Sequence, residues 1–250
     1  MRNLVLSCFI LSLVPMSPLA LQAEDAGARA IIESAIERNG GEKRLAKVKG
    51  TASKIKGSVH VNGIPVPFTG EIASHGGTRQ RISVSLTIDS QSVAFVSVVN
   101  QSEGWRKIVD NTVEMTADEL TEAKASAYSV YVQTLIPLRD KAFDLTSFGE
   151  REVAGRKVVG VTVSHEGRRP INLFFDKETY RLLRSEVTVR DETTFKEVPE
   201  ESTMSDFKEF DGVPRATKIT VKRNGQLHAE IEVEDFKTSE NVDEALFAKP

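Results

Sequence analysis

Apolar and polar residues alternate through residues 151–190, a pattern that predicts four short strands joined by three turns. Period-two alternation puts one set of side chains on a buried face of a sheet and the other set in water. Consecutive strands with tight turns pair antiparallel, because a parallel return needs a long crossover. The inward positions are Val161, Val163, Leu173, Phe175, Val187 and Val189.

The same alternation recurs on both sides of this segment and predicts further antiparallel strands. Asn62-Gly63, between two such runs, is a strong hairpin signal. Val84 and Leu86 lie on the inward face of a strictly alternating run, and Phe95 lies in a run that is apolar on both sides. The predicted strands outside 151–190 are 51–61, 65–74, 79–89, 91–100, 104–109, 112–115, 143–148, 202–210, 215–223 and 227–236.

Two segments have the periodicity of a helix instead. Residues 26–38 carry an apolar stripe, which Asn39-Gly40-Gly41 ends. Thr116-Ala117-Asp118-Glu119 is a capping box that starts a helix running to about residue 134 or 135. Tyr128 and Tyr131 lie on the apolar face of this long central helix.

Together these elements predict an α+β fold that is mainly β, with about eleven or twelve antiparallel strands. A single sheet of that size curls. Helices lying in its concave face are the simplest way to bury its apolar side. We expect one domain over residues 24–250, since the chain shows no fixed-period repeat and no low-complexity tract.

The first 23 residues have the order of a secretory signal. Arg2 gives a positive start, residues 4–14 are apolar, and a cleavage site follows Ala23. An uncleaved anchor is the weaker interpretation, because a spanning helix needs about 20 apolar residues. Lipidation at Cys8, the only cysteine, is weaker still, because the apolar stretch continues past it. We therefore expect an exported, periplasmic protein whose mature chain has no cysteine.

Charge and motifs narrow the function classes. The chain has 33 Lys and Arg against 36 Asp and Glu, which argues against nucleic acid as the main partner. The histidines at 60, 75, 165 and 228 share no metal-ligand spacing, and no nucleophile elbow or phosphate loop occurs. We therefore predict no catalytic residue, no metal and no cofactor. Trp105 is either a core aromatic or a pocket wall, since the two look alike in sequence.

Several turn and strand motifs resemble those of one family. They are Asn39-Gly40-Gly41-Glu42, Leu173–Thr179 followed by Leu182-Leu183-Arg184, Phe207–Pro214, and Asn241 with Ala245-Leu246-Phe247. With the signal and the long central helix, this order resembles the periplasmic proteins related to the lipoprotein carrier LolA and its outer-membrane receptor LolB. More narrowly, it is similar to the outer membrane lipoprotein-sorting protein branch. The resemblance implies an unclosed half-barrel, plugged by helices on its concave side, whose apolar hollow takes acyl chains.

We therefore expect a monomeric, non-enzymatic carrier of lipid or lipoprotein acyl chains. The alternative is an envelope interaction module that binds a protein partner through a sheet edge or its lid helices. An open apolar cavity would favour the carrier, and a filled core with a long bare edge strand would favour the module. The residues expected to line the hollow are Val84, Leu86, Phe95, Trp105, Tyr128, Tyr131, Val161, Val163, Leu173, Phe175, Val187 and Val189.

Overall fold

The computed structural model describes residues 19–250 except Thr193, and side chains from Ala26 onward. Most of the predicted signal lies outside this part, and the expected cleavage site after Ala23 falls within the first helix. The helical elements are α1 (Leu19–Arg38), α2 (Glu42–Leu45), α3 (Ala117–Val132), and the 3-10 turns η1 (Ile136–Arg139) and η2 (Glu244–Phe247). The strands are β1 (Gly50–Val61), β2 (Ile64–His75), β3 (Arg79–Ile88), β4 (Gln91–Asn100), β5 (Glu103–Ile108), β6 (Asn111–Glu114), β7 (Phe143–Val153), β8 (Arg156–His165), β9 (Ile171–Asp176), β10 (Leu182–Arg190), β11 (Glu197–Phe210), β12 (Val213–Arg223) and β13 (Gln226–Ser239).

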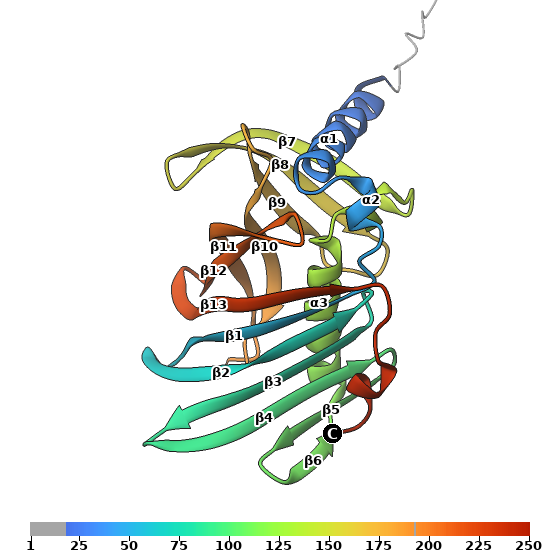
Figure 1. Cartoon of the computed structure of the whole chain (residues 1–250). Helices are drawn as coiled ribbons and strands as arrows, with labels where there is room; N and C mark the ends of the chain where they lie inside the picture. Colours follow the sequence, from blue (N-terminus) through green and yellow to red (C-terminus); the bar gives the residue numbers. More distant parts are fainter. Residues whose placement is uncertain (1–18, 193) are drawn as a thin grey trace, which may run out of the picture.

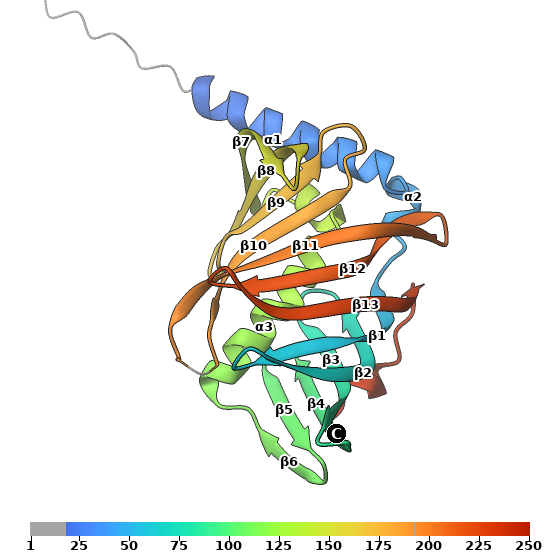
Figure 2. The same ribbon diagram turned by 90° about the vertical axis from the view of Figure 1, so that its left-hand side faces the viewer.

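All thirteen described strands belong to one antiparallel sheet, in the order β6-β5-β4-β3-β2-β1-β13-β12-β11-β10-β9-β8-β7. The outer strands β6 and β7 do not pair with each other, so the sheet is curled but unclosed (Figures 1 and 2). The prediction of a mainly β, unclosed half-barrel is confirmed. The predicted strand 143–148 and the start of 151–190 form the single strand β7, with a register shift between Ser147 and Gly149.

One face of the sheet can be followed from strand to strand, because directly paired residues point to the same side. Helix α3 lies against this face at both ends of the sheet. Tyr128 of α3 belongs to the same buried cluster as Val161 of β8, and Ser126 Oγ donates a hydrogen bond to Gln80 Oε1 of β3 at 3.0 Å. This face is therefore the concave one, with α3 inside the curl (Figure 1). One row of paired residues across it is Val161, Leu173, Ser185, Ser202, Val221, Ala229 and Val59.

Two glycines allow the sheet to bend sharply in its middle. A Cβ on Gly57 of β1 would lie 1.9 Å from the Glu230 carbonyl oxygen, and one on Gly70 of β2 would lie 2.3 Å from the Ser83 carbonyl oxygen. Neither position has room for a side chain, so neighbouring strands approach more closely than in a flat sheet. The curl is therefore encoded in part by these glycines.

Helix α3 begins and ends for local reasons. The predicted capping box is present, with the Thr116 amide donating to Glu119 Oε2 at 2.8 Å and the Glu119 amide donating to Thr116 Oγ1 at 3.3 Å. The helix ends at Val132, earlier than predicted, because Leu135 takes a φ of 70° and a 3-10 turn follows it. These features turn the chain from the hollow towards β7.

Candidate functional site

One end of the concave face is filled by helices, and we call it the filled end. Its side chains come from α1, α3, η1 and the strands β7 to β9, and they exclude water almost completely. The side chain of Arg29 in α1 adds hydrogen bonds to the carbonyl oxygens of Leu138 at 3.3 Å and Phe143 at 2.9 Å. The buried members include Ile32, Ile36, Tyr128, Val132, Leu138, Val161, Val163, Ile171, Leu173 and Phe175.

The middle of the same face carries a second apolar cluster that only strands build, and we call it the open floor. Three of its residues, Ile55, Phe68 and Val233, are buried, whereas the other six are half-buried. No helical residue belongs to the cluster, so apolar surface remains accessible inside the curl. Its half-buried members are Ile72, Val84, Leu86, Ile219, Ile231 and Phe236.

The structure divides the predicted lining residues between these two regions. Val84 and Leu86 belong to the open floor, and Phe95 pairs directly with Val84 and is half-buried beside it. Val187 is half-buried at the border of the filled end, and Val189 is half-buried on the same strand face. The remaining concave-face residues pack with helices in the filled end: Tyr128, Tyr131, Val161, Val163, Leu173 and Phe175.

Trp105 lies on the opposite, convex face. It pairs with Val98 of β4, and both pack against Phe247 of η2. Its neighbour Gly104 faces the hollow, where a Cβ would lie 2.7 Å from Leu120 of α3. The core-aromatic interpretation of Trp105 therefore fits its position, because the C-terminal turn covers it.

A cavity of about 250 Å³ lies beyond the C-terminal end of α3. The ring of Tyr131 forms one wall, and burial raises the pKa of its hydroxyl above the ordinary value. The cavity opens between the α2–β1 connection, the end of β2 and η1, so it adjoins the filled end and not the open floor. Its lining residues are Leu45, Ala46, Val48, Lys49, Gly50, Thr51, Ser74, His75, Gly76, Val130, Tyr131, Thr134, Ile136 and Pro137.

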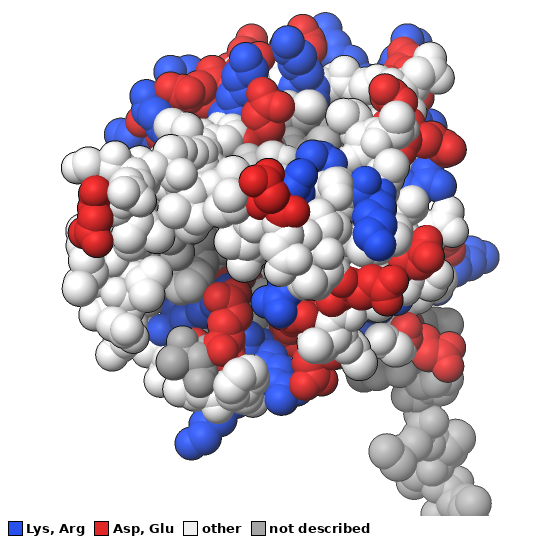
Figure 3. All heavy atoms as spheres, turned by 90° about the horizontal axis from the view of Figure 1, so that it is seen from below, with Lys and Arg blue, Asp and Glu red and all other residues white. Residues whose placement is uncertain are grey.

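Ion pairs hold the N-terminal half of α3 between the two ends of the sheet. Carboxylates near a helix N-terminus are stabilised by the helix dipole, and here each also meets an arginine from a strand or its flanking turn. The surface seen from below is hollowed, with acidic and basic side chains gathered beside the hollow (Figure 3). The pairs are Arg106–Glu119 at 2.9 Å, Arg169–Glu122 at 2.8 Å and Arg190–Asp118 at 2.8 Å.

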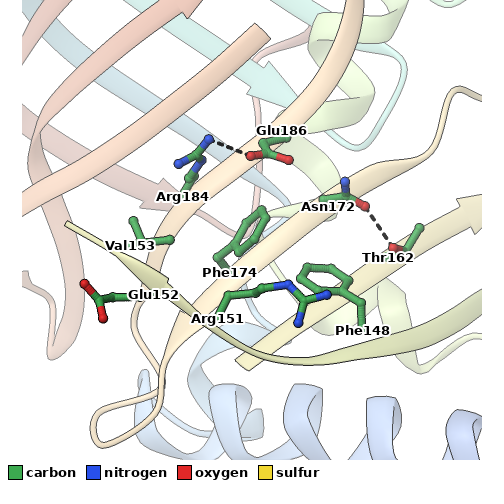
Figure 4. Close-up of a pocket in the computed structure, with 9 residues that line it drawn as sticks. All are labelled: Phe148, Arg151, Glu152, Val153, Thr162, Asn172, Phe174, Arg184 and Glu186. Atoms are coloured by element: carbon green, nitrogen blue, oxygen red, sulfur yellow. Dashed lines mark hydrogen bonds and ion pairs between the residues drawn. The ribbon is translucent and has the colours of Figure 1, made fainter. Parts of the chain in front are cut away.

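A larger depression, of about 400 Å³, lies on the convex face (Figure 4). Phe148 and Phe174 meet edge to face in it, with ring centroids 5.1 Å apart, and Gly160 leaves space for the Phe148 ring. Two of its charged groups form the ion pair Arg184–Glu186 at 2.7 Å. Phe174 alternates with the core residue Phe175, so this depression and the hollow lie on opposite faces.

Titratable groups offer little chemistry in the described part of the chain. No three His, Cys, Asp or Glu residues between 19 and 250, Thr193 aside, gather as a metal site. Burial lowers the pKa of His228, and the nearby Arg223 contributes to the shift. No helix of the described residues is long and apolar enough to cross a bilayer. What the hollow offers is apolar surface, with the ion pairs of α3 beside it.

Sequence reasoning missed several residues of the open floor and one charged neighbour. Phe68, Ile72 and Ile219 follow the same alternation of apolar and polar residues as Val84 and Leu86, so the sequence carries a signal for them. Arg215 was missed because an arginine at an inward position contradicts the pattern. Its neighbours Val213 and Ile219 show that this position of β12 faces the hollow.

Comparison with known proteins supports the fold. No protein-family model matches the chain, and no curated protein matches its sequence. An outer membrane lipoprotein-sorting protein domain from Vibrio parahaemolyticus aligns over 89% of this chain and 97% of its own, with 14% identity and a TM-score of 0.56. A DUF1329 family protein from Desulfovibrio piger aligns over 88% and 96%, with 13% identity and a TM-score of 0.57.

A LolA superfamily protein from Nitrosomonas europaea aligns over 89% of this chain and 97% of its own, with 12% identity and a TM-score of 0.55. At such identities a likeness establishes the architecture and leaves function to the site itself. The chain therefore has the fold of LolA superfamily and lipoprotein-sorting proteins, as its turn and strand motifs predicted.

Proposed function

We propose that the protein is a non-enzymatic, periplasmic carrier that binds a lipid or lipoprotein acyl chain on the open floor. The observation that carries the proposal is an apolar cluster inside the curl to which no described helix contributes. Exposed apolar surface in a concave site is typical of ligand binding. Each methylene removed from water contributes about 0.8 kcal/mol, so one acyl chain can supply much of the binding free energy.

The names of two structural neighbours agree with this proposal. One is described as a lipoprotein-sorting protein domain and the other as a LolA superfamily protein. An amphiphile that crosses an aqueous compartment needs its chain shielded from water, and a curled sheet with one apolar face provides such a shield. The predicted secretory signal would place the protein in that compartment.

The alternative is a module that binds a partner through a sheet edge. The outer strands of the sheet give it less support than the open floor gives the carrier. Helix α1 packs along β7, where Arg29 donates to the Phe143 carbonyl oxygen. On the other side, β6 has only four residues, and the Thr112 hydroxyl donates to the Pro250 carbonyl oxygen at 2.9 Å. Strand β6 is therefore too short to offer a long, bare edge for strand addition, and α1 occupies the start of β7.

Native mass spectrometry of the protein purified from a periplasmic extract, followed by lipid extraction, tests the proposal. We expect a co-purifying lipid or acylated peptide at a defined stoichiometry. Leu86→Gln, on the open floor, should reduce its occupancy, whereas Leu246→Gln, at an exposed position of η2 on the convex side, should leave occupancy unchanged. A ligand-free mass combined with no uptake of added fatty acid or lipopeptide would contradict the proposal.

A further inference from the structure

Arg215 lies on the concave face of β12, between the two apolar regions. On this strand Val213 belongs to the filled end and Ile219 to the open floor. Side chains two residues apart on a strand point to the same side, so Arg215 points into the curl with them. Its guanidinium lies over the ring of Phe236, a member of the open floor, at 5.0 Å from the centroid.

The guanidinium of Arg215 has no anionic partner among the described residues. Its Nε and Nη2 atoms are shielded from solvent and make no hydrogen bond. On the same face of β12, Arg223 provides a direct contrast, because its Nε donates to Glu200 Oε2 at 2.8 Å. Other arginines with a shielded Nε each have a carboxylate elsewhere on the guanidinium: Arg106, Arg184 and Arg190.

An unpaired charge at such a position opposes folding, because burial removes the water that would solvate it. Burial lowers the pKa of Arg215 to about 10, so the group remains a cation at neutral pH. The residue as a whole is half-buried, which leaves it within reach of a molecule in the hollow. A planar guanidinium donates two parallel hydrogen bonds to a carboxylate or a phosphate.

We propose that Arg215 binds the anionic group of an amphiphile whose chain lies on the open floor. This inference rests on the proposed carrier function and specifies its ligand class: an acyl or alkyl chain that ends in a carboxylate or phosphate. Phe236 connects the two parts of the site, since it packs within the open floor and also contacts the guanidinium. The ligand thereby supplies the counter-charge that the described chain lacks at this position.

Isothermal titration calorimetry with amphiphiles of equal chain length tests the inference. Dodecanoate, dodecyl phosphate and neutral dodecanol are titrated separately into the purified protein. The wild type should bind the better of the two anions at least about tenfold more tightly than dodecanol, a difference of about 1.4 kcal/mol. Whichever anion binds more tightly identifies the headgroup, and inorganic phosphate alone should bind far more weakly than dodecyl phosphate.

Arg215→Met removes the charge while keeping a side chain of similar length. In this variant the preference for the anion should disappear, whereas the affinity for dodecanol should change by less than about twofold. The melting temperature without ligand should be unchanged or higher, because an unpaired buried charge is removed. Arg215→Gln serves the same purpose if the methionine variant does not fold.

Arg223→Met is the matched control on the same strand face. It leaves Glu200 without its partner, so the melting temperature should fall while the preference for the anion persists. Equal binding of dodecanol and both anions by the wild type, or an anion preference that survives in Arg215→Met, would overturn the inference. Equally tight binding of inorganic phosphate would overturn the amphiphile as the ligand. If no amphiphile binds at all, the carrier function itself fails; if dodecanol alone binds, only the anion inference fails.

Discussion

The filled end and the open floor share one face of one sheet, yet they differ in what covers them. Over the filled end, α1, α3 and η1 bury the side chains of β7 to β9. On the open floor, every residue of the apolar cluster comes from β1, β2, β3, β12 or β13, and none comes from a helix. The difference shows that the same alternation of apolar residues produces a core where a helix covers it and an accessible surface where none does.

The two regions also differ in charge. The filled end is apolar apart from the Tyr128 hydroxyl, which is buried without a partner, and Arg29, whose guanidinium donates to the carbonyl oxygens of Leu138 and Phe143. The open floor is bordered on β12 by Arg215 and by the Arg223–Glu200 pair. In the filled end the charged group is bonded to the backbone, whereas a binding surface for an amphiphile needs a charged group that can contact the ligand.

Truncation in the filled end should have the largest effect on stability. Phe175→Ala removes a fully buried ring from between strands and helices, and we expect a loss of about 3–5 kcal/mol in the free energy of unfolding. Urea denaturation followed by circular dichroism measures this loss. A loss below about 1 kcal/mol would mean that the filled end is not packed as a core.

The turn after β9 should make the second largest contribution, and one that depends on pH. Burial alone would raise the pKa of Asp176, but hydrogen bonds from the Thr179 amide and hydroxyl, Arg156 and the Glu178 amide together lower it below its ordinary value. Because the folded-state pKa is lowered, the stabilisation is present above the unfolded-state pKa and is lost as pH falls below it.

We therefore expect Asp176→Asn to lose about 1–3 kcal/mol of stability at pH 7. The gap between wild type and variant should narrow as pH is lowered from about 5 towards 3, close to the ordinary pKa of an aspartate. Thermal unfolding of both proteins across this range measures the gap. A gap that stays constant with pH would show that the carboxylate charge is not what stabilises the turn.

Truncation on the open floor should affect binding as much as stability. Leu86→Ala removes apolar surface that is only half-buried, so we expect a loss of about 1 kcal/mol in the free energy of unfolding. The affinity for an acyl chain should fall by about fivefold for the same reason. Urea unfolding and lipid titration of the same preparation measure the loss of stability and the loss of affinity. Unchanged affinity in this variant would show that the acyl chain binds elsewhere, for example in the cavity beside Tyr131.

The smallest effect is expected on the convex face. Lys56 pairs with Glu234 at 2.8 Å in an exposed position, and such pairs contribute little. Lys56→Ala should leave both the melting temperature and lipid uptake unchanged, as measured by thermal unfolding and native mass spectrometry. A clear loss of lipid uptake would show that the ligand contacts the convex face of the sheet, and would contradict binding on the concave face.

Much of this fold follows from local sequence. Alternation at Val161 and Val163, the Asn62-Gly63 turn and the capping box at Thr116 each depend on residues close together in the chain, so they predicted strands, hairpin and helix start. Helix α3 ends at Val132, a few residues before its predicted end. The left-handed conformation of Leu135 depends on its tertiary surroundings, so the local sequence does not reveal it.

The sequence by itself determined the antiparallel sheet, its curl and an apolar face that something must cover. It did not determine how much of that face the helices cover, because coverage depends on contacts between residues far apart in the chain. Only the tertiary structure separated Leu86 from Phe175, moved Trp105 to the convex face and left Arg215 without a carboxylate. Side-chain alternation specifies which way a residue points, whereas packing decides what it meets there.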